Sequence, residues 1–214
     1  MFYKPEDGHG LPHDPFKAIV APRPIGWVST LDTGGRANLA PYSFFNGCGD
    51  RPPYVMFAQT GPKKPGGLLV KDTVTNCRET GEFACSLVSQ ALKDAMNVST
   101  EAFDAGVDEF EKAGLAKGAG QAIKVPHVAD APAVLECRTH QIVELPAWKE
   151  DWLNIVVIGE VVGVHVDEAC LKDGILDVLS YNPVARMGYK DYTTVTDRWE
   201  MDRPESEAWQ QKFR

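Results

Sequence analysis

Runs of β-branched, aromatic and alternating apolar residues dominate this chain, and they predict strands more often than helices. The longest run covers 153–166, where Leu, Ile and Val recur almost without interruption. Shorter runs of the same kind occupy 18–20, 25–31, 37–43, 54–59, 83–88, 133–143 and 175–179. About seven strands with hairpin-length connections favour a closed antiparallel sheet and therefore a mainly β fold.

Capping patterns predict a few helices between the strands. Asp72 is expected to cap a helix that ends at Gly81, since Asp accepts hydrogen bonds from free helix amides and Gly permits the left-handed C-terminal turn. Further helical segments are expected at 90–98 (capped by Ser89), 108–113 and 205–213. The rest of 99–126 indicates a loop long enough to suggest a function.

Length and composition indicate one globular domain over 1–214, with an irregular arm at about 1–17 and a charged tail at about 198–214. The hydrophobic share of 43% is enough for a core, and the net charge of -8 disfavours nucleic acid or an anionic membrane as a partner. No apolar run is long enough to span a bilayer, and the first residues lack the apolar segment of a signal peptide. We therefore expect a cytoplasmic protein.

The cysteines and histidines indicate neither disulfides nor a metal. Five cysteines without a Cys-x-x-Cys pair are expected to be reduced thiols. The five histidines are scattered, and Gly10 and Pro12 oppose a helix that would bring His9 and His13 together. We therefore expect no metal.

Polar residues in the hairpin of 25–31 and 37–43 suggest that it does more than fill a core. Asp32 and the glycines after it form the expected turn. The small donors and acceptors Ser29, Thr30, Asn38 and Ser43 alternate with apolar residues. Pro41 would leave a strand edge or bulge, where backbone groups stay available to a ligand.

An ordered set of motifs resembles the flavin reductase-like, FMN-binding split-barrel family, and most closely its flavoredoxin-type members. The set comprises Arg-Pro-Ile-Gly-Trp-Val-Ser-Thr (23–30), Asn-Leu-Ala-Pro-Tyr-Ser-Phe-Phe-Asn (38–46), Asp-Arg-Pro-Pro (50–53), Lys-Asp-Thr (71–73), Asn76, Gly-Glu-Phe (81–83), Asp-Glu-Phe-Glu-Lys-Ala-Gly-Leu (108–115) and Leu-Glu-Cys (135–137). The resemblance implies a Greek-key split β-barrel with flanking helices. It also implies bound FMN and a homodimer with the flavin at the subunit boundary.

The resemblance and the residue chemistry together give the candidate FMN contacts. In isolation, an ordinary cap with an exposed lysine explains Lys71, Asp72 and Thr73 better, but next to the hairpin and with the resemblance they would hold the phosphate at a helix N-terminus. Arg23 would reach the phosphate or ribityl chain, or form a surface salt bridge. The remaining candidates are donors or acceptors, ring-stacking side chains and hairpin backbone: Ser29, Thr30, Asn38, Ser43, Ala40, Trp27, Tyr42, Phe44 and Asn97. The alternatives for these are core packing and, for Asn97, helix capping.

These features favour an NAD(P)H-dependent reductase of flavin or of a small acceptor. The chain has no Gly-x-Gly-x-x-Gly, phosphate-binding loop or His-Glu-x-x-His motif, and no catalytic acid or base is assigned, because the cofactor supplies the chemistry. An electron carrier reduced by a partner protein, docking through Lys63, Lys64 and the 99–126 loop, remains open, as does a non-redox FMN-binding module. In the reductase, the 99–126 loop would cover the nicotinamide opposite a wall formed by 186–192, and shortening it within 114–122 should change the nicotinamide affinity more than the FMN affinity.

Overall fold

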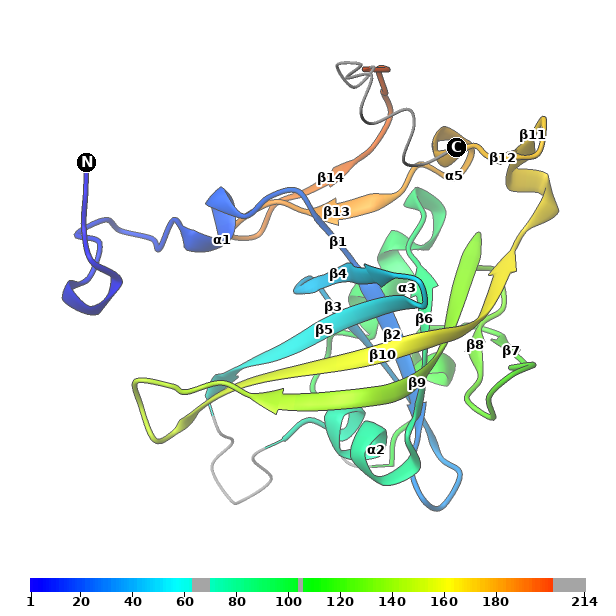
Figure 1. The fold of residues 1–214 in the computed structure, drawn as a ribbon, viewed down its shortest axis with the longest axis horizontal. Helices are drawn as coiled ribbons and strands as arrows, with labels where there is room; N and C mark the ends of the chain where they lie inside the picture. The colour runs from blue at the N-terminus through cyan, green and yellow to red at the C-terminus, as the bar shows by residue number, and fades with distance from the viewer. Residues whose placement is uncertain (63–69, 104–105, 202–214) are drawn as a thin grey trace.

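The computed structural model describes residues 1–62, 70–103 and 106–201, and its centre is a strongly curved antiparallel sheet (Figure 1). Seven strands pair in the order β3-β2-β6-β9-β10-β5-β4. These are β2 (Gly26–Leu31), β3 (Ala37–Tyr42), β4 (Phe45–Asp50), β5 (Pro53–Pro62), β6 (Glu82–Leu87), β9 (Ala133–Glu144) and β10 (Trp152–Val166). Because β3 also contacts β5, the sheet curls into a barrel, and the predicted mainly β barrel is confirmed.

Short elements flank this barrel. Three small sheets are formed by β1 (Arg23–Pro24), β13 (Val184–Arg186) and β14 (Tyr192–Thr194), by β7 (Lys117–Gly118) and β8 (His127–Val128), and by β11 (Leu171–Lys172) and β12 (Ile175–Leu176). The helices are η1 (Pro5–Asp7), α1 (Phe16–Ile19), α2 (Asp72–Thr80), η2 (Gln90–Leu92), α3 (Lys93–Val98), α4 (Glu109–Lys112), η3 (Glu168–Cys170) and α5 (Val178–Tyr181). None of the described helices is long and apolar enough to cross a membrane.

Strand β2 explains why the first hairpin mixes apolar and polar residues. Both of its faces are covered: Val28 packs into the barrel interior with Phe57 and Phe83, while Trp27 packs outside with Met96 and Phe110. The strand is therefore buried almost throughout, instead of having one solvent-exposed face. Its hydroxyl groups must find partners inside the protein, because an unpaired buried polar group is costly.

Most predicted elements are present, and the differences have local causes. Residues 18–20 do not form a strand, because the short helix α1 extends to Ile19. The strand β4 was not predicted, since Gly47 and Gly49 lower its strand propensity and lie at a register shift. Lys71 is the N-cap of α2 in place of Asp72, whereas Gly81 ends the helix in the left-handed conformation as expected.

Two further helix predictions have different outcomes. The helix expected over 90–98 is divided into η2 and α3, and the Ser89 side chain makes no capping hydrogen bond. The helix expected at 205–213 lies outside the described residues.

Gly159 provides a test of how closely the barrel strands pack. A Cβ atom at Gly159 would lie 2.3 Å from Cζ of the buried Phe83 and 3.2 Å from Cβ of Cys137. We therefore expect Gly159→Ala to lower the free energy of unfolding by about 1–3 kcal/mol, the usual cost of overpacking a core. Urea denaturation measures this, with Gly47→Ala as the control, because the nearest atom to a Cβ there is 3.9 Å away. Equal losses in both variants would contradict the packing argument.

Candidate functional site

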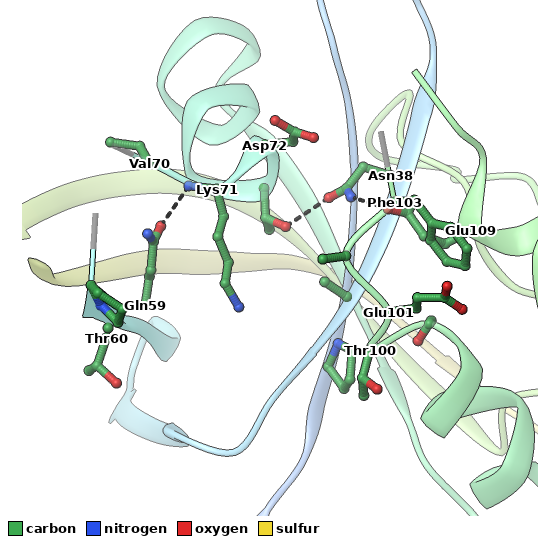
Figure 2. A pocket seen from close by; sticks show the side chains of 17 residues that line it. Asn38, Gln59, Thr60, Val70, Lys71, Asp72, Thr100, Glu101, Phe103 and Glu109 are labelled. Carbon is green, nitrogen blue, oxygen red and sulfur yellow. Dashed lines mark hydrogen bonds between the residues drawn. The ribbon is translucent and has the colours of Figure 1, made fainter. Parts of the chain in front are cut away.

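A cavity of about 430 Å³ opens between the edge strand β3, the end of β5 and the N-terminus of α2 (Figure 2). Residues 99–103 and Glu109 form its remaining wall. Because β3 pairs only with β2, the predicted edge at Pro41 is confirmed, and it faces this cavity. The volume falls within the range of about 300–1,000 Å³ that is usual for small-molecule sites.

The N-terminus of α2 gives one side of the cavity a positive character. The first amides of a helix have no partner within the helix, and together with the helix dipole they favour an anion. Gln59 of β5 fixes this end of the helix, because its Oε1 accepts a hydrogen bond of 3.0 Å from the Lys71 amide. The Lys71 side chain extends into the cavity, with its Nζ 5.3 Å from the centroid of the Tyr42 ring (Figure 2).

Asn38 connects the three elements that surround the cavity. Its Oδ1 accepts a 2.7 Å hydrogen bond from the Thr73 hydroxyl, and its Nδ2 donates to Glu109 Oε1 at 3.0 Å. The other carboxylate oxygen of Glu109 accepts from the Leu39 amide at 3.0 Å. One amide side chain on β3 thus sets the positions of α2 and α4 relative to the sheet.

Glu109 places a carboxyl group on the wall across from Lys71. Burial raises the pKa of Glu109, and the hydrogen bonds from Leu39 and Asn38 partly oppose that shift. Among the described lining residues Lys71 is the one cationic side chain, and Asp72, Glu101 and Glu109 are acidic, so positive charge is confined to Lys71 and the amides at the start of α2 (Figure 2). A ligand with an anionic end and neutral polar groups matches this polarity.

The structure brings only some of the predicted cofactor residues to this cavity. Those that line it are Asn38, Ala40, Lys71, Asp72 and Thr73. They come from β3 and the start of α2, the two segments whose polar character suggested a ligand.

Three other candidates from the hairpin are buried behind the cavity. The indole nitrogen of Trp27 donates to Ser99 Oγ at 2.9 Å, and Ser29 Oγ donates to the Pro126 carbonyl at 2.5 Å. Thr30 Oγ1 accepts from Asn76 Nδ2 at 2.9 Å. All three side chains have no exposed surface, so they support the fold here, and a direct contact with a cofactor stays a prediction.

Arg23, Tyr42, Ser43 and Phe44 lie apart from the cavity lining. Arg23 is buried, donates to the carbonyl groups of Lys17 and Val20, and lies 5.7 Å above the centroid of the Phe44 ring. Burial and the neighbouring Arg186 lower the pKa of Arg23. Tyr42 packs on Phe57 with ring centroids 4.7 Å apart, and burial raises its pKa.

Asn97 lines a second cavity of about 350 Å³, between α3 and the sheet of β13 and β14. Tyr192 lines the same cavity, and no residue of 186–192 lines the first one. The expected cover, 99–126, divides between two places. Residues 121–123 are held by hydrogen bonds to Glu136, whereas 99–103 line the first cavity. A buried carboxylate keeps part of 114–122 away from the role that its Gly and Ala content suggested.

Sequence analysis missed Gln59 and Glu109 as site residues. Gln59 looks like an ordinary residue of a predicted strand, and Glu109 like a residue of a short acidic helix. Only the approach of β5 to α2 and of α4 to β3 shows their roles. The Asp-Glu pair at 108–109 was a weak local signal for Glu109. Asp108 caps α4 by accepting from the Phe110 amide, and this makes Glu109 the first residue of that helix.

Comparisons with known proteins agree on one family. Residues 20–183 match the model of the flavin reductase like domain. The crystal structure of nitrilotriacetate monooxygenase component B from Bacillus cereus is 26% identical, with a TM-score of 0.83 over 94% of this chain and 98% of that one. The 2-nitrobenzoate 2-nitroreductase NbaA from Pseudomonas fluorescens is 28% identical, with a TM-score of 0.75 over 88% of both chains. Flavoredoxin of Desulfovibrio vulgaris (Miyazaki F), 23% identical with a TM-score of 0.72 over 85% of this chain and 91% of that one, shares the fold.

The raised pKa of Glu109 has a consequence for stability that can be measured. The folded protein binds a proton at Glu109 more readily than the unfolded chain, in which a glutamate has a pKa of about 4.3. The favourable contribution is therefore complete at low pH and lost as the pH rises through the folded pKa. Lowering the pH from about 7 toward about 4.3 should stabilise the wild type relative to Glu109→Gln in urea denaturation. Glu111→Gln on the same helix is the control, and a parallel response of both variants would contradict the prediction.

Proposed function

This chain belongs to the flavin reductase-like family, and from that premise we propose that it binds FMN and reduces a flavin or another small acceptor with NADH or NADPH. The family and the enzymes among its structural neighbours support a flavin-dependent oxidoreductase. The observation that carries the choice of FMN is the N-terminus of α2, which opens with Lys71 into a cavity of suitable size.

The residues around this cavity fit a phosphorylated flavin. A phosphate would accept hydrogen bonds from the free amides at the start of α2 and from the Lys71 ammonium group. The Thr73 hydroxyl, which donates to Asn38 Oδ1, would hold Asn38 in place beside them. Asn38 and the exposed backbone edge of β3 near Ala40 would bind polar groups of the ribityl chain. The Glu109 side would disfavour a second anionic group, which suits a ligand with a single phosphate.

The isoalloxazine ring supplies the redox chemistry when it is bound, and the residues of the chain bind and orient it. Residues 99–103 would shield the ring side of the cavity from water. Thr100 and Glu101 are exposed, whereas Ser99 is buried and accepts from the Trp27 indole, so the part of this wall that follows Ser99 could be displaced without opening the core. A nicotinamide ring could then approach within the 3–3.5 Å or so that hydride transfer requires.

We also propose a homodimer. Large apolar side chains are exposed along the N-terminal arm, which extends away from the barrel (Figure 1). Phe2, Phe16 and Ile19 are among them, at 89%, 53% and 73% exposure. A two-fold partner would cover them, and such dimers are the commonest oligomers.

The electron-carrier alternative has less support. Lys63 and Lys64, which suggested a docking face, lie outside the described residues. Two structural neighbours above 25% identity are a monooxygenase component and a nitroreductase, which favours an enzyme. The non-redox binding module has no specific observation in its favour.

The phosphate site leads to a prediction about ligand preference. Lys71→Ala removes a charge-assisted hydrogen bond to the phosphate, worth about 1.5–3 kcal/mol, so FMN should bind about tenfold more weakly or worse. Riboflavin lacks the phosphate and should be affected much less. Fluorescence titration with both ligands measures the difference, with Lys124→Ala as a control remote from the cavity. Equal losses for FMN and riboflavin would rule out the phosphate site at α2.

The proposed reductase activity can be tested directly with the purified protein. NADH or NADPH should bleach the absorbance of bound FMN under anaerobic conditions without any other protein. Dithionite serves as the positive control for a reducible flavin. If the flavin stays oxidised with both nucleotides, yet dithionite reduces it and a partner protein reoxidises it, the chain is a carrier and the proposed reductase is wrong.

A further inference from the structure

Two histidines and one glutamate meet at a point that the proposed flavin site does not use. His127 lies on β8, Glu136 on β9 and His165 on β10. One potential ligand atom from each lies within 4.8 Å of the others, and no other such group of three occurs in the part of the chain that the structure describes. No sequence motif indicated this group, because its three residues are separated along the chain and come from three different strands.

The backbone makes room for these side chains. On the sheet, Glu136 pairs with Gly163, so Glu136 and His165 project from the same face. A Cβ atom at Gly163 would lie 3.3 Å from Glu136 Oε2. Likewise, Gly118 pairs with His127, and a Cβ atom there would lie 2.3 Å from His127 Nε2. A side chain at Gly163 would therefore crowd the Glu136 carboxylate, and one at Gly118 would displace the His127 imidazole.

His127 has an unused buried nitrogen. The residue is only 8% exposed, and its Nδ1 has no hydrogen-bond partner. The His127 and His165 rings lie side by side, with centroids 4.6 Å apart. Burial and the neighbouring His165 lower the pKa of His127, which keeps its imidazole in the neutral form that binds metals. A buried imidazole nitrogen without a hydrogen-bond partner, close to a second imidazole and a carboxylate, is an environment that a shared cation would fit.

The other two residues are suitable partners. Glu136 is fully buried, and its carboxylate accepts hydrogen bonds from the amides of 121–123 and contacts His165 Nε2. Burial raises the pKa of Glu136, but the hydrogen bonds from His165 and the 121–123 amides outweigh it and lower the pKa overall. The His165 side chain is 25% exposed, which leaves a route from solvent.

We propose that His127, Glu136 and His165 form a binding site for a divalent transition metal, with Zn²⁺ as the reference ion. Two imidazoles and one carboxylate are a ligand set that Zn²⁺ accepts, and the fourth position would face solvent beside His165. Ligand atoms around a tetrahedral Zn²⁺ lie about 3.3 Å apart, so the widest separation in the set would shorten by up to about 1.5 Å while His165 turns away from Glu136. The bound ion would tie β8 to β9 and β10.

This site also gives the buried Ser29 hydroxyl a role. Ser29 Oγ holds the Pro126 carbonyl, and Ser86 Oγ accepts from the Val128 amide at 3.2 Å. The barrel therefore fixes the backbone on both sides of His127. A rigid support of this kind is what a precise ligand position requires.

The test is metal binding by the full-length protein after treatment with a chelator. Calorimetric titration with Zn²⁺ should show one ion per chain, and Zn²⁺ should raise the melting temperature. His165→Ala and His127→Ala should each weaken Zn²⁺ binding about 100-fold or more, since even the loss of outer-sphere groups costs 10–100-fold or so.

Matched variants separate this site from surface binding. His140→Ala removes an exposed histidine of β9 whose ring contacts the Tyr54 ring edge-on. A double His9→Ala, His13→Ala variant removes the histidines of the N-terminal arm. Both should bind Zn²⁺ like the wild type. If His127→Ala does not fold, the more exposed His165→Ala decides, with its far-ultraviolet circular dichroism as the check on folding. Wild-type Zn²⁺ affinity in a folded His165→Ala variant, or no Zn²⁺ binding by the wild type, would overturn the proposal.

Discussion

The pairing of β10 on both sides is the constraint on which the rest of the structure depends. Residues 152–160 pair with β5 along one edge and 155–166 pair with β9 along the other, so most of its polar backbone is satisfied within the sheet. Two register shifts against β9 accompany the curvature that lets β3 meet β5. The cavity edge at β3 and the His127, Glu136 and His165 group both follow from that curvature.

Buried polar residues then determine where the helices lie. A barrel that is covered outside as well as filled inside leaves its hydroxyl and amide groups without water, and each must bond to protein. Asn38 meets this requirement by joining Thr73 of α2 to Glu109 of α4, which places a helix N-terminus and a carboxyl group on one cavity. The interaction that stabilises the fold thus also sets the polarity of the candidate flavin site.

Like Asn38, Glu136 on β9 positions a neighbouring segment through hydrogen bonds. Its carboxylate accepts from the 121–123 amides, and this keeps 121–123 away from the cavity that the 99–126 loop was expected to cover. The long connection after α3 therefore divides into two parts. Residues 99–103 border the candidate flavin site, and 117–128 border the proposed metal site.

Local periodicity, capping and ordered motifs were enough to predict most of the strands, the hairpin turn, the helix that becomes α2 and the family. The same local chemistry pointed to Lys71 and Thr73 at a helix start and to Asn38 in the hairpin as candidate site residues. Packing was needed to show that Trp27, Ser29 and Thr30 are internal, that Gln59 and Glu109 adjoin the candidate site, and that His127 meets His165. Each of these depends on which strand or helix covers a given face, and that is set by packing between segments distant in the chain.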